Sequence, residues 1–420
     1  MADHGARGHA KWSASATARN VACPGALALG QRVAPKDTES EAAAWGTACH
    51  QVSERCLREG KDAAAFIGTV ERTKERDIPV DDELAECAQV YVDYCRALRD
   101  VVETSGGFTA IEQYFSFDAI NPPMEAGGTA DFTAYFREER RLEVVDLKGG
   151  RGVRVEVAGN AQLRSYALGA MLANPGLGVS EITVTIVQPR APHKDGRIRS
   201  ETFATFDLIE WANDLLLAMK MSACAEREAT DPLKDVVWQT AYLRAGDHCK
   251  FCPAAGVCPR LERDALDKVG VWFDPVTDEP RISNAPDTLP SEELAKRLDA
   301  LDMIEDWIQA VRAYAHAQAE SGVVIPNYQL VERVGRRAWA ADEEKIVYDL
   351  RNVVGLPDDV LWTRKLKSPA QIEKELGSKR KGEIKFMWSS PVTGTNLVRV
   401  DKTNRPPLRP VVEKYFQAVN

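Results

Sequence analysis

Residues 127–150 read G-G-T-A-D-F-T-A-Y-F-R-E-E-R-R-L-E-V-V-D-L-K-G-G, and this stretch decides the fold class. Two apolar-rich runs, 129–136 and 142–147, lie between its glycine pairs, and runs bounded in this way are typical of short strands. Only a brief charged segment separates them. The sequence therefore predicts two neighbouring strands of one hairpin, and each strand carries an aspartate, Asp131 and Asp146.

Three charged side chains on this hairpin suit phosphate chemistry. Asp131 and Asp146 are expected to converge on one hard cation, because Mg²⁺ is commonly held by one or two carboxylates together with substrate phosphate and water. Lys148 follows Asp146 by two residues, so strand alternation places both on one face. There it is predicted to position an attacking water or to neutralise charge developing on a phosphate. A D-x-K at a strand end is, by itself, equally typical of a solvated turn.

Two predicted helices add polar side chains at helical spacing. In W-G-T-A-C-H-Q-V-S-E, His50 and Glu54 are four residues apart and share a face. An imidazole added to two carboxylates makes a site that accepts Mn²⁺ as readily as Mg²⁺. In N-A-Q-L-R-S-Y-A-L-G-A, Gln162 and Tyr166 form a polar pair within an apolar stripe. The alternative is that His50 and Tyr166 are ordinary core residues.

The order of these motifs resembles the PD-(D/E)XK nuclease superfamily. It runs G-x-x-x-H-x-x-x-E, a strand glutamate (Glu112 in A-I-E-Q-Y), G-x-x-D, D-x-K and Q-x-x-x-Y, and it covers residues 10–265. The resemblance is greatest to RecB-type nuclease domains and to the iron–sulfur exonucleases of CRISPR adaptation and of AddB. It implies metal ligation by His50, Asp131 and Asp146, with Glu54 as a further ligand, catalysis by Lys148, and supporting or DNA-contacting roles for Glu112, Gln162 and Tyr166.

The cysteines give a separate signal. Three of the nine form Cys249-x₂-Cys252-x₅-Cys258, a spacing that brings thiols to one soft metal centre. Cys23 is the best candidate for a fourth ligand, because it also precedes a proline, as Cys252 and Cys258 do. Spacing alone fits a zinc ion at least as well as an iron–sulfur cluster. The resemblance implies a [4Fe–4S] cluster. The other five are expected to be buried, inert thiols: Cys49, Cys56, Cys87, Cys95 and Cys224.

Further periodicity extends the fold prediction beyond the hairpin. Helical spacing of apolar residues runs over 82–103 and 207–228, and strand alternation runs over 182–186. With the Glu112 strand, these segments predict an α/β fold that has a mixed central sheet flanked by helices. The resemblance identifies this arrangement as the PD-(D/E)XK core.

The predicted domain organisation has three parts. Residues 1–268 form the nuclease domain with its cysteine cluster. Residues 269–290 form a linker, because Asp-Pro, Glu-Pro, Ala-Pro and Leu-Pro steps interrupt it. Residues 291–420 form a smaller α+β region that opens with a long helix from Ser291 and is expected to contact DNA.

Charge and composition limit which partners and which cellular compartment the sequence favours. The net charge is −9, but residues 321–420 carry 18 Lys and Arg against 12 Asp and Glu, an excess that suits phosphate contacts or simply a solvated surface. Arg151 and Arg154 are the expected strand-guiding residues. No apolar run approaches the roughly 20 residues that span a bilayer, and an odd number of cysteines fits a reducing compartment. We expect a cytoplasmic protein that has no membrane association.

The expected function is that of an Mg²⁺- or Mn²⁺-dependent DNA exonuclease. The whole chain also resembles an uncharacterised family of bacteriophages and prophages, which implies a role in phage DNA recombination or replication in a bacterial host. Linear DNA ends, single- or double-stranded, are the expected substrate, and phage recombination or single-strand-binding proteins are candidate partners. Ring-forming relatives leave a homo-oligomer open. The alternatives are an accessory protein that binds DNA without cutting it and an RNA-directed nuclease.

Overall fold

The computed structural model describes residues 10–33, 39–151, 153–269, 271–273, 280–282, 290–330, 342–353, 357 and 361. The chain divides into two compact units, Met1–Leu330 and Val331–Asn420. The first unit holds the sheet, its helices and all predicted site residues. In the second, helix α10 (Glu343–Asn352) begins at Asp342, whose side chain accepts a hydrogen bond from the Lys345 backbone N–H at 3.0 Å. The predicted C-terminal region, 291–420, thus spans both units, and nearly all of it after residue 353 lies outside the described residues.

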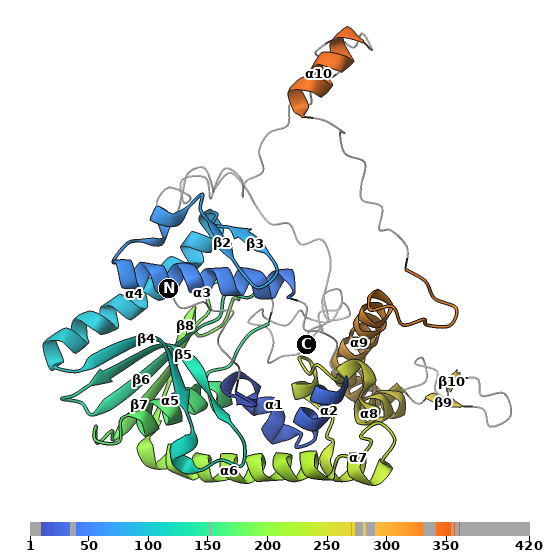
Figure 1. Cartoon of the computed structure of the whole chain (residues 1–420), viewed down its shortest axis with the longest axis horizontal. Helices are drawn as coiled ribbons and strands as arrows, with labels where there is room; N and C mark the ends of the chain where they lie inside the picture. The colour runs from blue at the N-terminus through green and yellow to red at the C-terminus, as the bar shows by residue number, and fades with distance from the viewer. Residues whose placement is uncertain are drawn as a thin grey trace, which may run out of the picture. The chain divides into compact units, whose positions relative to one another are not determined.

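A mixed six-stranded sheet forms the centre of the first unit (Figure 1). Its strands are β1 (Trp12–Ser13), β4 (Phe108–Ser116), β5 (Ala126–Phe136), β6 (Arg141–Leu147), β7 (Glu181–Val187) and β8 (Ile198–Ala204). β4 pairs along one side of β5, while β1 and then β6 pair along the other side, and β7 and β8 follow β6. The β1–β5 and β6–β7 pairs are parallel and the others are antiparallel. The predicted mixed α/β sheet is confirmed, whereas β1 and β8 were not predicted.

Two helical layers cover the two faces of this sheet. Helices α3 (Glu41–Glu59) and α4 (Asp82–Ser105) lie on one face, and α5 (Ala161–Ala173) and α6 (Thr205–Glu228) lie on the other (Figure 1). Helix α3 begins where the Ser40 side chain accepts a hydrogen bond from Ala43, and α4 begins where Asp81 accepts one from Leu84. Such caps satisfy backbone N–H groups that have no partner within the helix. Each layer buries its own apolar core against the sheet.

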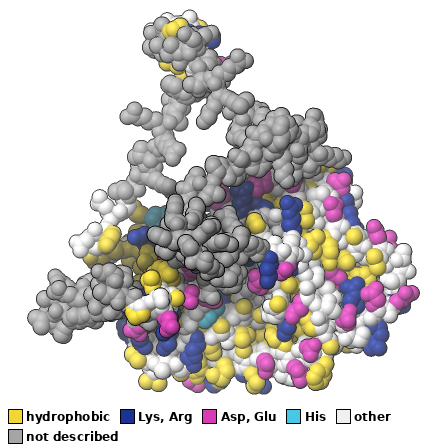
Figure 2. Space-filling view, turned by 180° about the vertical axis from the view of Figure 1, so that it is seen from behind, with side chains coloured by type: hydrophobic (Ala, Val, Ile, Leu, Met, Phe, Trp, Pro, Cys, Tyr) yellow, Lys and Arg dark blue, Asp and Glu magenta, His cyan; other side chains and the backbone are white. Residues whose placement is uncertain are grey.

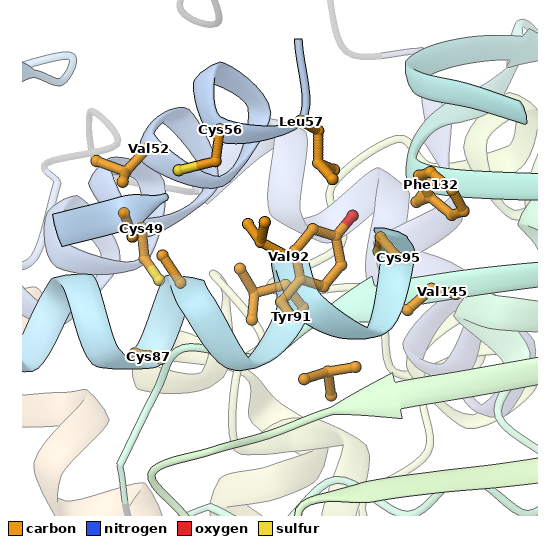
Figure 3. Packing of buried hydrophobic residues seen from close by; sticks show 14 of the residues in the cluster. Cys49, Val52, Cys56, Leu57, Cys87, Tyr91, Val92, Cys95, Phe132 and Val145 are labelled. Carbon is orange, nitrogen blue, oxygen red and sulfur yellow. The ribbon is translucent and has the colours of Figure 1, made fainter. Parts of the chain in front are cut away.

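The core between α3 and α4 contains four of the nine cysteines. Cys49 and Cys56 come from α3, Cys87 and Cys95 come from α4, and all four are buried and free (Figure 3). They pack with residues such as Val52, Tyr91 and Phe132, as small apolar side chains would. Cys224 lies on α6 and is half-buried and free. The four buried thiols agree with the prediction of buried cysteines, whereas Cys224 is less buried than predicted, and its Sγ accepts a hydrogen bond from Arg227 Nη2 at 3.2 Å.

A third core lies at the end of the unit where the N-terminal helices meet the cysteine-rich segment. Its elements are α1 (Thr17–Ala22), α2 (Ala26–Val33), α7 (Val236–Tyr242), the 3₁₀ turns η4 (Asp247–Cys249) and η5 (Ala255–Val257), α8 (Pro259–Val269) and α9 (Ser291–Glu320). Helix α9, which the sequence assigned to a separate region, contributes Met303, Trp307 and Ala310 to this core. The site of the four predicted cysteine ligands is therefore built from both ends of the unit.

Short elements complete the first unit. They are η1 (Ala14–Ala16), η2 (Ala63–Phe66), η3 (Asp118–Ile120), and the antiparallel pairs β2 (Val70–Arg72) with β3 (Asp77–Pro79) and β9 (Val271–Phe273) with β10 (Pro280–Ile282). The last pair lies inside the predicted linker, which is therefore not wholly irregular. Proline is tolerated as the first residue of a strand, and Pro280 holds that place. None of the described helices has both the length and the apolar character that a membrane crossing needs.

Candidate metal and active site

The centre of the candidate site is a twist in the sheet at Glu112 and Asp131. Glu112 lies between the paired residues Ile111 and Gln113, opposite Asp131, and its φ of 51° is in the left-handed region. A glutamate rarely adopts that conformation, which costs on the order of 1–3 kcal/mol and persists only where surrounding contacts impose it. On β5, Ala130 packs under α5 and α6, whereas Phe132 packs under α3 and α4. Residues two apart would share a face in a regular strand, so β5 turns over at Asp131.

Three side chains from three elements converge at this twist. The Nδ1 atom of His50, from α3, lies 3.4 Å from Oδ2 of Asp131 and 3.9 Å from Oε1 of Glu112. The candidate ligand atoms of all three residues lie within 4.8 Å of one another. Asp131 Oδ2 also accepts a hydrogen bond from the Leu147 backbone N–H at 2.7 Å, just beyond the β5–β6 pairing. The Glu112 and Asp131 side chains are only 8% and 11% exposed, whereas the His50 side chain is 27% exposed. The cluster is therefore most accessible at the imidazole ring.

The charges of this trio perturb one another. Burial raises the pKa of Asp131, and the nearby Asp146 and Glu112 carboxylates raise it further, against the opposing effect of His50. Burial lowers the pKa of His50, but the Asp131 and Glu112 carboxylates outweigh it and raise the pKa to about 9. Without a cation, His50 therefore carries a proton and acts as the counter-charge to the carboxylates. A divalent cation would take over that function.

A second chain of polar contacts begins at Asp146. The Lys148 Nζ atom lies 2.9 Å from Asp146 Oδ2 and donates to Asp146 Oδ1 at 3.2 Å and to Gln162 Oε1 at 3.0 Å. Gln162 Nε2 in turn donates to the Tyr166 hydroxyl at 2.8 Å. Burial lowers the pKa of Lys148, but Asp146 more than offsets this and holds it above its ordinary value. Burial raises the pKa of Tyr166 well above its ordinary range, so the phenol stays protonated.

One oxygen of Asp146 keeps lone pairs for another partner. Oδ2 is buried, and among the described residues it has no partner in hydrogen-bond geometry. Its 2.9 Å approach to Lys148 Nζ is a charge contact, since the same ammonium directs its hydrogen bond to Oδ1. A buried carboxylate oxygen in this state is suited to a cation.

Glu54 is placed differently from the other predicted ligands. It lies one turn beyond His50 on α3, and its Oε1 atom is 2.8 Å from Arg58 Nε. Arg58 Nη2 also donates to the Ile111 carbonyl at 3.1 Å, next to the strained Glu112. Glu54 and Arg58 thus brace β4, while Glu112 occupies the position beside His50 and Asp131. Sequence reasoning missed Arg58, although its i,i+4 spacing from Glu54 was a readable signal.

A second brace holds the loop after Lys148. Arg190 Nη1 donates to the Gly149 carbonyl at 3.0 Å, and its guanidinium carbon lies 3.6 Å from the centre of the Trp45 ring. A Cβ atom on Gly149 would come within 3.0 Å of the Trp45 ring, so glycine permits this close approach. The contact joins α3, which carries His50, to the end of β6. Arg190 follows β7, and no spacing in the sequence links it to Trp45.

A cavity of about 700 Å³ opens onto the site. His50, Glu112, Asp131 and Lys148 line it, and most of the remaining wall consists of small residues from the N-terminal segment, α3 and the start of β5. Tyr114 of β4 is the aromatic side chain in this lining. Arg151, a predicted strand-guiding residue, pairs with Glu83, and Glu83 also binds Arg190 at 3.0 Å. Acidic and basic side chains are interspersed over the face of the molecule in Figure 2.

The four predicted cysteine ligands line one small apolar cavity. Cys23 follows α1, and the other three lie in the segment that contains η4 and η5. Burial is the largest cause of a raised thiol pKa at all four: Cys23, Cys249, Cys252 and Cys258. The Arg244 backbone N–H donates to Cys23 Sγ at 3.3 Å. Within the described part of the chain, no three of these sulfur atoms all lie within 4.8 Å of one another.

Comparison with known proteins identifies a family. One solved structure, described as "Crystal structure of SSO0001", is 15% identical in sequence, and the match covers 50% of this chain and 85% of that one, with a TM-score of 0.21. A TM-score of this size carries no conclusion about the fold. A family model described as "Protein of unknown function (DUF2800)" matches residues 9–403. The chain therefore belongs to the DUF2800 family.

Proposed function

We propose that this protein is a metal-dependent nuclease of the PD-(D/E)XK type that hydrolyses phosphodiester bonds in DNA. The observation that carries the proposal is the convergence of His50, Glu112 and Asp131 in one open cavity that Lys148 also lines, with Asp146 behind it paired to Lys148. These residues come from separate elements, and a strained backbone at Glu112 and a buried ion pair support them. Clusters of titratable groups with shifted pKa values in a cleft mark candidate catalytic sites.

The donors suit Mg²⁺ or Mn²⁺. His50, Glu112 and Asp131 offer one imidazole and two carboxylates, and Asp146 Oδ2 offers a buried oxygen that has no hydrogen-bond partner among the described residues. Oxygen-rich sets of this kind hold hard cations, and the imidazole extends the choice to Mn²⁺. Such a cation, when bound, would lower the pKa of water and stabilise charge on the phosphate.

The chain's own residues supply positioning and charge. Asp146 and Gln162 accept two of the three Lys148 ammonium protons, and the third remains for a substrate oxygen in the cavity that Lys148 lines. Tyr166 fixes the orientation of Gln162 through its hydroxyl. Because its raised pKa keeps Lys148 protonated, it would stabilise negative charge on the phosphate as attack proceeds.

The four cysteines are proposed to hold a [4Fe–4S] cluster. Cys23, Cys249, Cys252 and Cys258 would be its ligands. A single tetrahedral zinc ion with Zn–S bonds of about 2.3 Å would draw its sulfurs to roughly 3.8 Å from one another. The order of the cysteines, one before the nuclease motifs and three after them, resembles that of the iron–sulfur nucleases, and this resemblance favours the larger centre. The cluster would join α1 and α2 to the segment before α8.

Anaerobic purification tests the cluster assignment. The expected result is brown protein that contains iron and acid-labile sulfide and loses both in a Cys258→Ser variant. A colourless protein that retains stoichiometric zinc and no iron would exclude the cluster. Cys224→Ser is the matched control, since Cys224 does not line the cysteine cavity.

A cleavage assay tests the nuclease function. End-labelled linear DNA and circular DNA are incubated with Mn²⁺ or Mg²⁺ and with wild-type protein, Lys148→Met or Asp131→Asn. We expect cutting of linear DNA that falls by about 100-fold or more in both variants, the scale on which loss of a charge-stabilising group acts. Lys61→Met is the control, because Lys61 pairs with Glu59 on the surface. Equal cutting by wild type and both variants would disprove the proposal.

A further inference from the structure

Tyr114 is an exposed aromatic side chain inside the candidate active-site cavity. It follows Glu112 by two residues on β4, and 43% of its surface is exposed. The cavity that it lines also contains His50, Asp131 and Lys148. Large aromatic side chains normally bury most of their surface, so an accessible ring beside reactive groups is a candidate ligand contact.

The Tyr114 ring lies against strand β5. Tyr114 pairs with Thr129 on β5, and its ring reaches along that strand to Gly127. A Cβ atom on Gly127 would lie 2.6 Å from the Tyr114 hydroxyl oxygen and 3.0 Å from its Cζ atom. The absence of a Cβ at Gly127 therefore leaves room for the ring beside the strand.

The cavity lining places polar groups around the ring. Ser13 pairs with Gly127, against which the Tyr114 ring lies, and its hydroxyl lies 3.2 Å from that of Ser15. The same lining contains His50 and the Lys148 ammonium, which suit a phosphate.

The size of the cavity matches a short length of one strand. Its volume of about 700 Å³ falls in the range of about 300–1,000 Å³ that encloses small ligands. A nucleotide or two of a single strand fits that space.

Resting on the proposed nuclease function, we propose that Tyr114 stacks on a base of the single-stranded DNA end whose phosphate lies at His50, Asp131 and Lys148. Stacking uses the π-face that every base shares, so the site reads single-strandedness with little dependence on sequence. The base lies against the exposed ring, and its phosphate lies beside the Lys148 ammonium.

Binding without cleavage isolates this contact from catalysis. The probes are a fluorescent thymidine homopolymer, the same strand with abasic sites at its terminal positions, a duplex and the matching RNA, each titrated by anisotropy in Ca²⁺ buffer. Tyr114→Ala is expected to weaken binding of the thymidine strand about tenfold, since a base stacked on an aromatic ring contributes about 1–3 kcal/mol. The abasic strand should bind wild type and Tyr114→Ala equally, and Tyr114→Phe should bind like wild type.

The controls separate this inference from the nuclease proposal. Tyr328→Ala removes another exposed tyrosine and should change nothing, and thermal melts verify that each variant folds. Equal loss on base-bearing and abasic strands, no loss on either, or tighter binding of the duplex would overturn the inference. The same Tyr114 dependence on RNA would overturn its assignment to DNA. Because no result here needs cleavage, an inactive protein that shows the base-dependent loss would refute only the nuclease function.

Discussion

His50 links cation binding to pH. Its pKa of about 9 in the fold exceeds the ordinary value of 6.5, so at neutral pH a cation must displace its proton. We predict that Mn²⁺ affinity, measured by calorimetry, rises about tenfold per pH unit up to about pH 9 and that buffers of different ionisation enthalpy reveal proton release. His50→Gln should flatten this slope. An affinity in wild type that does not vary with pH would contradict the assignment.

The raised pKa of His50 also affects the stability of the cation-free protein. That stability falls as the pH rises, whereas the affinity for Mn²⁺ increases. The folded pKa of His50 is raised, so its stabilising contribution is complete below about pH 6.5 and is lost as the pH rises through about 9. Alkaline conditions thus weaken the empty site while they favour the occupied one.

Glu112 and Glu54 make a matched pair for identifying the metal ligands. Glu112 lies with His50 and Asp131, whereas Glu54 is held by Arg58. We predict that Glu112→Gln lowers Mn²⁺ affinity by tenfold or more, since it removes a charge from the cation's own donors, and that Glu54→Gln has a smaller, indirect effect. Electron paramagnetic resonance of Mn²⁺ titrations measures both. A larger loss in Glu54→Gln would restore Glu54 as the ligand.

Whether the sequence could predict a residue of the candidate site depends on how far along the chain that residue lies from its partners. Asp131, Asp146 and Lys148 are readable because strand alternation within one hairpin relates their side chains. The position of Glu112 depends on a positive φ that β5 and Arg58 impose, and no local pattern encodes it. The contact of Arg190 with Trp45 joins residues 145 positions apart along the chain and depends on tertiary packing.

At the scale of elements, Gly46 lies within α3, one turn before His50, without a packing reason. Nothing lies within 4 Å of the position that its Cβ would take, and the residue lines the candidate-site cavity. Glycine inside a helix costs about 1 kcal/mol relative to alanine. We infer that the open space serves the substrate.

Two substitutions at Gly46 should therefore separate stability from binding. Gly46→Ala is predicted to raise the free energy of unfolding by about 1 kcal/mol, as measured by urea denaturation. Gly46→Leu extends into the cavity and should weaken single-stranded DNA binding several-fold while the protein stays folded. Unchanged DNA binding by Gly46→Leu would show that the substrate takes another path.

Elements differ in how clearly the sequence encodes them. Helices α4 and α6 and strand β7 carry long runs with one periodicity, and the structure places them within two residues of the predicted bounds. Strand β1 has two residues, too few for any period, and β8 alternates largely polar residues at the end of the sheet. Pairing with β5 and β7 forms these two strands, and pairing is a property of the whole sheet.

At the scale of the whole first unit, α9 covers the cysteine loop. A Cβ atom on Gly256, which lies between Cys252 and Cys258, would come within 2.5 Å of the Ala310 carbonyl and 2.7 Å of Tyr314 Cβ on α9. Gly256→Val should therefore displace α9 and expose the thiols. We predict at least severalfold faster reaction of the apo-protein with a thiol reagent and faster loss of the bound metal centre in air. Gly176→Val is the control, since its Cβ meets nothing within 4 Å. Equal rates in the two variants would show that α9 does not protect this loop.

The core around the four predicted cysteine ligands can form only late in translation. Cys23, Ala26 and Leu29 emerge early, yet their partners in this core begin about 200 residues later, at Ala225. At roughly 5–20 residues per second, the N-terminal helices wait on the order of ten to fifty seconds for the rest of that core. The hairpin that carries Asp131 and Asp146 is synthesised within that interval. A nascent chain therefore contains Asp131 and Asp146 of the candidate site before the core around Cys23 can close.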